Sequence, residues 1–361
     1  MKVWIDLRFI WEDIYSKFIS QLVEELIETE REHEYIIYWN WINRDYKDKK
    51  VIIKNVNIKI WSFEEQTKLN KIFKKDKNHL MLFFNQYKPI LYKWQYITFI
   101  WSLKDIYYMN FTSWYEKFKF LFLIEKNIKK SYRLICFDEN SKEELIEKFD
   151  VKETKIFLLN WFFPSNNFKI LSEDNEISVN IKTKYSINND FFIYSWWDSI
   201  EKNYEKLIPV FSRLLDNWYK FDLVFLWHNI SSNLNLRNLI LETNMQNNVH
   251  FLWLVDEIDK YHLYKEAKWT IFPSFYEPFP FKLAEPMFHN SPIIASDLKS
   301  IKATFDKWIK YFSPISINSI YESIKEFIDE SEKWKKKIDY SEILSKYNKE
   351  NSCKRLIEII K

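Results

Sequence analysis

The stretch that most constrains the fold of this 361-residue chain runs from Thr270 to Asp297. Two short apolar segments flank a loop that contains Pro278 and Pro280, and a segment with helical spacing follows that loop. Proline removes a backbone donor and interrupts a regular helix, so the prolines separate the first strand from the helix. The stretch therefore predicts a strand over Thr270–Pro273, a loop over Ser274–Phe281, a helix over Phe281–Phe288 and a second strand over Pro292–Ser296. Such a strand–helix–strand unit is typical of a parallel α/β sheet.

Two carboxylates stand out in this stretch. Glu277 lies in the loop just past the first strand, and Glu285 follows on the helix. Ligands of open parallel sheets bind at the carboxyl ends of the strands, in front of helix N-termini. Both acids are therefore expected to face a ligand crevice. The alternative is a structural role, with Glu277 capping the helix and Glu285 exposed to solvent on it.

The alternation of strands and helices continues through both halves of the chain. In the first half it predicts strands at 1–6, 34–38, 51–60, 79–84, 95–100, 133–137 and 155–159, and helices at 18–29, 64–73, 113–128 and 141–149, the last with Ser141 as its N-cap. In the second half it adds strands at 191–194, 223–226, 250–252 and 310–312, helices at 202–215, 233–243, 256–266 and 317–329, and a terminal helical pair over 340–361. A polar stretch over 160–190 separates the halves. This rhythm predicts an α/β protein with doubly wound domains at 1–165 and 166–340 and a terminal helix at 341–361.

Composition argues against several classes of protein. The net charge is +3, and Lys and Glu are spread along the chain, so there is no strong electrostatic case for nucleic-acid binding. Cys136 and Cys353 are too few for a disulfide framework, and we expect a reducing, cytoplasmic compartment because the N-terminus lacks the pattern of a secretory signal. No run of about 18 uncharged apolar residues predicts a membrane span. The six histidines are scattered, so we expect no metal site.

The chain contains no glycine and 17 tryptophans, where ordinary usage of about 7% would give roughly 25 glycines. Without glycine, a positive φ at a turn or helix end carries a steric cost. Several tryptophans stand where glycine is expected, namely Trp4, Trp196, Trp197, Trp227 and Trp308. We hypothesise that the gene reads UGA as glycine and that these positions are glycine in the native protein. The alternative is a genuine glycine-free protein, and tryptophan masses at positions 4, 196 and 227 in native peptides would establish it.

The stretch described first also carries a specific motif. It reads Phe-Pro-Ser, one residue, Tyr-Glu, alternating phenylalanines, the second acid and then Pro-Ile-Ile-Ala-Ser-Asp. This pattern resembles the signature of family-4 glycosyltransferases, the retaining nucleotide-sugar enzymes, and their mannosyltransferase-like branch in particular. The resemblance implies the GT-B fold, in which two Rossmann-like doubly wound domains face an interdomain cleft and the last helix packs back on the N-terminal domain. The resemblance spans nearly the whole chain; it is specific in the second domain and loose in the first.

The resemblance assigns roles in donor binding to five residues. Glu277 matches the first acid of the signature, beside the donor sugar, and is the expected catalytic residue, either as nucleophile or as electrostatic stabiliser. Glu285 matches the acid that hydrogen-bonds the nucleotide ribose. Lys202 matches the lysine that binds the diphosphate at the start of a helix. Phe279 and Phe281 fall in the loop whose amides approach the donor.

The chain also departs from the family pattern. The partner arginine of many members falls on Trp197, which we keep among the expected donor-binding positions. In the first domain, Lys17 is the cation that matches the acceptor-side arginine. Trp101 and Ser102 stand where mannosyltransferase-like members carry His-Asp, so that histidine is absent.

The resemblance thus implies a metal-independent enzyme of cell-envelope polysaccharide biosynthesis. It would transfer a hexose, expected to be mannosyl or glucosyl, from a nucleotide-diphosphate sugar to a glycan or lipid-linked acceptor with retention. No cofactor is expected besides this donor, and a lipid-linked acceptor implies a peripheral contact with the inner membrane face. The rival hypothesis is a catalytically impaired paralogue that binds a glycan or a nucleotide, and transfer assays with a panel of nucleotide sugars separate the two. A sugar-phosphate isomerase of similar architecture fits the fold but not the spacing of the acids.

Overall fold

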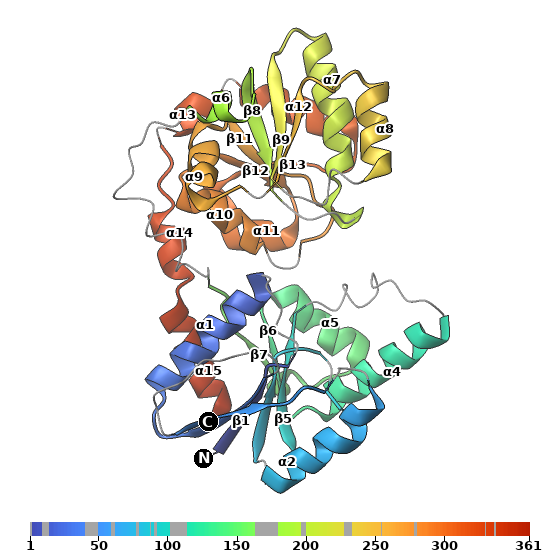
Figure 1. Cartoon of the computed structure of the whole chain (residues 1–361), viewed down its shortest axis with the longest axis vertical. Helices are drawn as coiled ribbons and strands as arrows, with labels where there is room; N and C mark the ends of the chain where they lie inside the picture. The colour runs from blue at the N-terminus through green and yellow to red at the C-terminus, as the bar shows by residue number, and fades with distance from the viewer. Residues whose placement is uncertain are drawn as a thin grey trace. The chain divides into compact units, whose positions relative to one another are not determined.

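The computed structural model describes residues 2–8, 14–39, 50–58, 62–76, 79–86, 88–89, 92–101, 114–162, 180–195, 200–226, 233–253, 255–277, 280–328, 330–335 and 337–361. The chain forms two compact units (Figure 1). Unit 1 comprises Met1–Pro164 and Tyr347–Lys361, and unit 2 comprises Ser165–Lys346. Residues 341–346, which the sequence assigned to the terminal helix, belong to unit 2.

Unit 1 is built on a parallel sheet whose described strands have the order β3-β2-β1-β4-β5-β6-β7. The strands are β1 (Lys2–Asp6), β2 (Glu34–Trp39), β3 (Val51–Asn55), β4 (Leu80–Phe83), β5 (Gln95–Ile100), β6 (Arg133–Cys136) and β7 (Ile156–Leu158). The helices are α1 (Ile14–Thr29), α2 (Asn70–Asp76), α4 (Trp114–Lys130), α5 (Glu139–Phe149) and α15 (Lys349–Ile360), with short turns η1 (Glu65–Leu69) and η2 (Glu153–Lys155). Helices cover a parallel sheet on both faces, which is why β1, β2 and β4 are nearly continuous apolar runs.

The last helix of the chain belongs to the first unit. Helix α15 lies along α1 (Figure 1), and its ends are held by ion pairs from Lys349 to Glu25 at 2.7 Å and from Lys361 to Glu30 at 2.9 Å. The face of α15 that packs inward includes Leu356, which is fully buried. The chain therefore completes unit 1 only after it has passed through unit 2.

Unit 2 is built on a second parallel sheet, with the order β10-β9-β8-β11-β12-β13 among its described strands. The strands are β8 (Asp190–Tyr194), β9 (Phe221–Leu226), β10 (Val249–Leu252), β11 (Trp269–Phe272), β12 (Ile293–Ser296) and β13 (Lys310–Phe312). The helices are α6 (Ile181–Lys184), α7 (Leu207–Asp216), α8 (Leu234–Glu242), α9 (Glu257–Glu266), α10 (Ala284–Phe288), α11 (Lys299–Phe305), α12 (Ile317–Ile328), α13 (Ser331–Lys335) and α14 (Ser341–Lys346), with short turns η3 (Ile200–Lys202), η4 (Tyr204–Lys206), η6 (Phe281–Leu283) and η7 (Asp306–Trp308).

Both sheets run outward in two directions from their first strand, so each is doubly wound. The order reverses between β1 and β4 in unit 1 and between β8 and β11 in unit 2. The predicted class, α/β with two Rossmann-like doubly wound domains, is confirmed.

Two local predictions were wrong. The N-cap of α5 is Asp138, not Ser141, because the Asp138 carboxylate accepts the backbone N–H of Ser141 at 2.8 Å and the helix starts at Glu139. The helix predicted from residue 202 starts only at Leu207. Lys202 instead ends the short turn η3, and Asn203 after it is left-handed with φ of 55°, which prevents a continuous helix.

Helix ends show how the chain turns without glycine. Just past α6, α8, α10 and α7, a residue with positive φ follows the last turn: Ser186 (56°), Asn244 (55°), Asn290 (51°) and Trp218 (69°). After α7, the Trp218 N–H donates to the Leu215 carbonyl and the Tyr219 N–H to the Leu214 carbonyl, at 2.9 and 3.1 Å. This is the Schellman motif, whose left-handed position is usually glycine and sometimes asparagine. The Trp218 side chain is 91% exposed, so little packing offsets the steric cost of a bulky left-handed residue.

We predict that Trp218→Gly raises the free energy of unfolding by about 1–2 kcal/mol, because glycine adopts this conformation without the Cβ clash. Urea unfolding monitored by circular dichroism measures the change. The matched control is Trp269→Gly: Trp269 is fully buried in β11 and donates its indole N–H to the Phe327 carbonyl at 3.1 Å, so its loss should cost about 3–5 kcal/mol. Equal stability of Trp218→Gly and the parent chain would contradict the strain argument. A glycine mass at position 218 in native peptides would support the recoding hypothesis.

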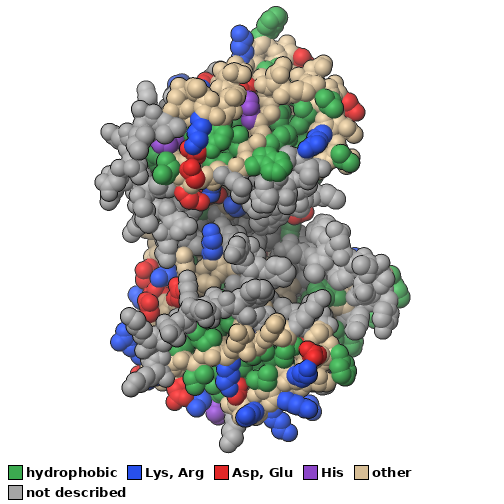
Figure 2. All heavy atoms as spheres, viewed as in Figure 1, with side chains coloured by type: hydrophobic (Ala, Val, Ile, Leu, Met, Phe, Trp, Pro, Cys, Tyr) green, Lys and Arg blue, Asp and Glu red, His purple; other side chains and the backbone are tan. Residues whose placement is uncertain are grey.

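The surface carries charges of both signs. Figure 2 shows acidic and basic side chains together on the face that it draws, with Lys and Arg more numerous along the lower edge of unit 1. Among the described residues, no helix is both long enough and apolar enough to cross a membrane.

Candidate functional site

The carboxyl edge of the unit 2 sheet brings Lys202 and Glu277 together. Lys202 follows β8 and Glu277 follows β11, the two neighbouring strands between which the strand order reverses. The Lys202 Nζ lies 2.7 Å from the Glu277 Oε2, and the two side chains are only 4% and 2% exposed. In a doubly wound sheet, ligands bind in the crevice at this reversal. The pair therefore occupies the place where the topology favours a ligand site.

The backbone around the pair is held by the residue after Lys202. The Asn203 side-chain amide donates to the carbonyl of Pro273, at the end of β11, at 2.8 Å and to that of Pro314, beyond β13, at 3.2 Å. The Phe275 N–H donates to the Glu201 carbonyl at 2.8 Å. These bonds tie the loop after β8 to the loop after β11, so the two charged side chains meet in a fixed geometry.

Burial makes the pair sensitive to the loss of either partner. Removing an ion from water costs several kcal/mol, and only the opposite charge compensates for it in the interior. The Ser274 hydroxyl also lies 3.5 Å from the Glu277 Oε2, and the Ser300 hydroxyl donates to the Glu277 backbone carbonyl. Glu277 is thus held both through its side-chain carboxylate and through its backbone carbonyl.

Glu285 lies on α10 and is held between two lysines. Lys260, on α9, donates to its Oε1 at 2.9 Å, and Lys282, on the turn before α10, donates to its Oε2 at 3.2 Å. Burial alone would raise the pKa of Glu285, but the charges of Lys282 and Lys260 outweigh it and hold the pKa at about 2. Burial alone would lower the pKa of Lys260, but the negative charge of Glu285 outweighs this effect, and the pKa of Lys260 lies above its ordinary value. Glu285 is therefore a buried, ionised hydrogen-bond acceptor.

Two aromatic side chains pack beside this cluster. The rings of Tyr264 and His289 stack with their centroids 5.4 Å apart and their planes 12° apart. Burial, and then the negative charge of Glu285, raise the pKa of Tyr264 well above its ordinary value. Burial lowers the pKa of His289 to about 4, so its ring is neutral at physiological pH. Both rings are therefore neutral, and the negative charge of Glu285 is compensated by Lys260 and Lys282.

The remaining predicted site residues are Trp197, Phe279, Phe281 and Lys17, and the structure shows no contact of theirs with Lys202, Glu277 or Glu285 among the described residues. Trp197 and Phe279 lie outside the described residues, and for Phe281 the structure describes the backbone, which begins η6, but not the side chain. Lys17 lies on α1 of unit 1 and is exposed.

The sequence prediction did not include Lys260 and Lys282. Lys282 lies three residues before Glu285, a helical spacing that could have identified it, whereas Lys260 comes from a separate helix. In unit 1 the prediction also lacked Arg8. Its guanidinium donates to Asp6 at 2.8 Å and to Glu65 at 2.9 Å at the carboxyl end of β1. Burial disfavours the Arg8 charge, but the two carboxylates outweigh it and raise the pKa.

The described residues contain no group of three or more His, Cys, Asp and Glu side chains arranged to hold a metal ion. The chemistry of the described site is that of ammonium groups, carboxylates and hydroxyls.

Residues 180–344 match the protein family described as "Glycosyl transferases group 1". The matched segment lies within unit 2 and contains Lys202, Glu277 and Glu285. The family match thus covers most of unit 2, including both strands that flank the strand reversal. None of the curated proteins compared with the chain matches it significantly.

Solved structures of glycosyltransferases share the fold over the whole chain. HepE from Anabaena, in complex with UDP and glucose, aligns with a TM-score of 0.72 at 12% identity. The alignment covers 100% of this chain and 99% of the HepE chain. WaaG, a glycosyltransferase involved in lipopolysaccharide biosynthesis, has a TM-score of 0.71 at 13% identity, with 99% of each chain covered. A glycosyltransferase from Rickettsia africae has a TM-score of 0.69 at 13% identity, covering 99% and 97%. At these identities the likeness establishes the GT-B fold.

Proposed function

We propose that the chain, whose unit 2 matches the group 1 glycosyltransferase family, transfers a hexosyl group from a nucleotide-diphosphate sugar to an acceptor hydroxyl with retention. The observation that carries the proposal is the buried Lys202–Glu277 pair, 2.7 Å apart at the strand reversal of that same domain. Group transfer from a diphosphate needs a fixed cation where negative charge develops on the leaving group. It also needs an anion beside the sugar carbon that becomes positive. The pair supplies one of each.

In this proposal, Lys202 binds the diphosphate and stabilises its growing charge as the bond to the sugar breaks. An ammonium has three N–H donors, so it can bind phosphate while it remains bonded to a carboxylate. Glu277 lies beside the reacting carbon, where its negative charge stabilises the oxocarbenium-like centre.

Glu285 serves as the acceptor for the nucleotide ribose. Each carboxylate oxygen has two lone pairs, so bonds from Lys260 and Lys282 leave capacity for hydroxyl donors. The low pKa of about 2 keeps the carboxylate ionised, which is the form that only accepts hydrogen bonds.

The solved relatives support a sugar nucleotide as donor and a glycan as acceptor. The HepE structure is a complex with UDP and glucose, and WaaG is involved in lipopolysaccharide biosynthesis. We therefore propose a glucosyl or mannosyl donor, an acceptor that is a growing glycan or its lipid-linked form, and a role in building cell-envelope polysaccharide. No metal is required in this scheme, because Lys202 supplies the positive charge at the diphosphate.

A panel of UDP- and GDP-hexoses tests the proposal. Saturation-transfer NMR reports binding of each donor, and release of nucleoside diphosphate in the presence of a membrane-glycan extract reports transfer. We expect one or two donors to bind and turn over. Absence of binding by every donor, with correctly folded protein, would contradict the proposal.

The acceptor side of the proposal includes a peripheral membrane contact through α4. Phe118 and Phe122 lie one helical turn apart and are both exposed, and Lys129 and Lys130 lie in the last turn of the same helix. Exposed aromatic rings next to lysines are typical of helices that lie in the interface of an anionic bilayer. This pattern supports a lipid-linked acceptor at the inner membrane face of a cytoplasmic enzyme.

We predict that Phe118→Ser with Phe122→Ser weakens partitioning into anionic vesicles by about tenfold or more, because each buried ring contributes on the order of 1–2 kcal/mol. Vesicle co-sedimentation measures the partition coefficient. Phe63→Ser is the control, since Phe63 is 83% exposed in unit 1 but lies outside α4. An equal loss for Phe63→Ser, or none for the α4 variant, would exclude α4 as the contact.

One observation favours the rival proposal of an impaired, ligand-binding paralogue. Trp101 follows β5 at the position where mannosyltransferase-like members carry histidine. Its indole N–H donates to the Phe84 carbonyl at 2.6 Å, and its ring stacks on Phe137 with centroids 4.7 Å apart. A packed indole cannot transfer protons. The donor panel separates the proposals, because the paralogue binds a donor without releasing nucleotide.

A further inference from the structure

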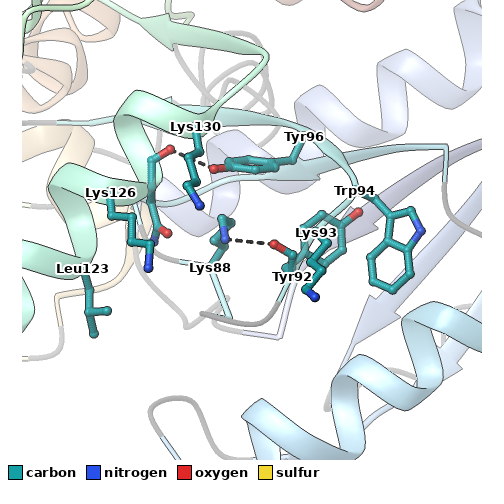
Figure 3. A pocket seen from close by; sticks show the side chains of 9 residues that line it. Lys88, Tyr92, Lys93, Trp94, Tyr96, Leu123, Lys126 and Lys130 are labelled. Atoms are coloured by element: carbon teal, nitrogen blue, oxygen red, sulfur yellow. Dashed lines mark hydrogen bonds between the residues drawn. The ribbon is translucent and has the colours of Figure 1, made fainter.

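Unit 1 contains a pocket that the proposed reaction does not use. Its volume is about 490 Å³, which is the size of small-molecule sites in proteins. The side chains that line it include Lys88, Tyr92, Tyr96, Lys126, Asn127 and Lys130 (Figure 3). They come from the loop after β4, the start of β5 and the last turns of α4. The pocket therefore opens at the amino edge of the unit 1 sheet, whereas Lys202, Glu277 and Glu285 belong to unit 2.

Lys88 forms the base of the pocket and is only 4% exposed. Its Nζ donates to the carbonyls of Pro89 and Tyr92 at 3.2 and 3.3 Å and lies over the Tyr96 ring, 5.0 Å from the centroid. These partners are neutral dipoles and a π face. A buried ammonium is ordinarily compensated by a carboxylate. No carboxylate is among the described residues that line this pocket.

Further cations face the same space. Figure 3 shows the side chains of Lys88, Lys126 and Lys130 converging, although they come from two separate segments. Burial, and then the charges of Lys130 and Lys126, lower the pKa of Lys88 to about 8, which agrees with this close approach of like charges. Three ammonium groups repel one another, so the arrangement is unfavourable until an anion occupies the pocket.

The wall of the pocket carries an unused donor. Asn127 is 4% exposed, and its side-chain Nδ2 has no hydrogen-bond partner among the described residues. Its backbone carbonyl, in contrast, accepts from the Tyr96 hydroxyl at 2.9 Å, which fixes Asn127 against β5. A buried amide donor without a partner costs on the order of 1–3 kcal/mol.

We propose that this pocket binds a phosphate group, carried either by a soluble phosphorylated metabolite or by a lipid headgroup. A phosphate monoester has a charge of about −1.5 to −2 at neutral pH and three acceptor oxygens, which match three ammonium groups better than a single carboxylate does. The Tyr92 and Tyr96 rings supply an apolar wall for the group that carries the phosphate. The exposed rings of α4 lie on the same helix as Lys126 and Lys130, which makes a lipid phosphate one of the two sources.

Isothermal titration calorimetry with inorganic phosphate and pyrophosphate tests the site. The full chain with Lys202→Met and Glu277→Gln serves as the background, so that pyrophosphate binding at the donor site cannot contribute. We expect millimolar or tighter binding, weakened about tenfold by each of Lys126→Gln and Lys130→Gln, since each removes one charge-assisted hydrogen bond. Both lysines are exposed, so these variants should fold.

Lys129→Gln is the matched control. Lys129 lies in the same helical turn but outside the pocket, and it pairs with Glu125 at 2.7 Å. Its replacement should leave the affinity for inorganic phosphate within about twofold, because it removes an exposed charge that does not touch that ligand. An equal effect of Lys129→Gln would indicate general electrostatic attraction and overturn the proposal.

Vesicles of phosphatidylcholine with and without phosphatidic acid identify the source of the phosphate. Binding of soluble phosphate without vesicles supports a metabolite. Recruitment to phosphatidic acid that depends on Lys126 and Lys130, without soluble binding, supports a lipid headgroup. Failure of both probes overturns the site but leaves the donor-site proposal unaffected, because that proposal is tested with nucleotide sugars and wild-type protein.

Discussion

Replacing Lys202 by methionine should lower kcat/KM for sugar transfer by about 100- to 1000-fold, the effect of removing one fixed stabiliser of transition-state charge. Glu277→Gln should lower kcat by a similar factor, because the neutral amide no longer stabilises the positive sugar centre. Steady-state assays of nucleotide release with the best donor measure both effects.

The stability of these variants needs a separate measurement. Breaking a buried ion pair by removing one partner leaves an uncompensated charge and costs about 3–5 kcal/mol. The double variant Lys202→Met with Glu277→Gln leaves neither charge, so it should regain most of this stability while remaining as inactive as the worse single variant. Such non-additive loss is typical of residues that act as a unit.

Lys206→Met is the control for this prediction. Lys206 lies on η4, one turn beyond Lys202, and donates to the Ile315 carbonyl at 2.7 Å with its ammonium 4.3 Å from the Phe275 ring centre. It therefore resembles Lys202 in position but makes no ion pair with Glu277. We expect its activity within about fivefold of wild type, since it touches no group assigned to the reaction. Activity within tenfold of wild type for both Lys202→Met and Glu277→Gln would refute the proposed roles.

Acid should destabilise the protein through Glu285. Its folded-state pKa of about 2 lies below the ordinary 4.5. Its contribution to the free energy of unfolding is therefore fully present above pH 4.5 and is lost as the pH falls from 4.5 to about 2. The shift corresponds to about 3 kcal/mol, of which about 2 kcal/mol is lost by pH 3. The unfolded chain takes up the proton first, which is why lower pH favours unfolding.

Urea unfolding at pH 5 and pH 3 measures this contribution. The wild type should lose about 2 kcal/mol more than Glu285→Gln over this interval, because glutamine does not titrate. Glu322→Gln is the control, since Glu322 is exposed and its contact with Arg213 is long, at 3.8 Å. Wild type and Glu285→Gln curves that shift in parallel with pH would show that Glu285 does not carry this acid sensitivity.

The strands of the fold were predictable because they are short apolar runs with polar boundaries. The bounds predicted for β5 and β13 agree with the structure at both ends. The predicted start of the helix at residue 202 was wrong because Asn203 adopts a left-handed conformation, stabilised by carbonyls of residues 70 and 111 positions away in sequence. A local pattern cannot report contacts of that range.

For the candidate site, too, local sequence patterns identified individual residues but not their long-range contacts. Glu277, Glu285 and Lys202 were identified as candidates from motif and position alone, and the structure places Lys202 against Glu277. The sequence could not show that Lys260 reaches Glu285, because that contact depends on how α9 packs beside α10. It also could not show that the loop lysines and the end of α4 share a pocket. Those relations come from tertiary packing and not from spacing.

The position of α15 has a consequence for biosynthesis. During translation, residues 347–361 emerge after every residue of unit 2, yet they cover α1 and pair with Glu25 and Glu30. The apolar face of α1 that α15 covers therefore stays exposed until residues 347–361 have been synthesised. We infer that nascent chains halted before Tyr347 depend on chaperones to stay in solution.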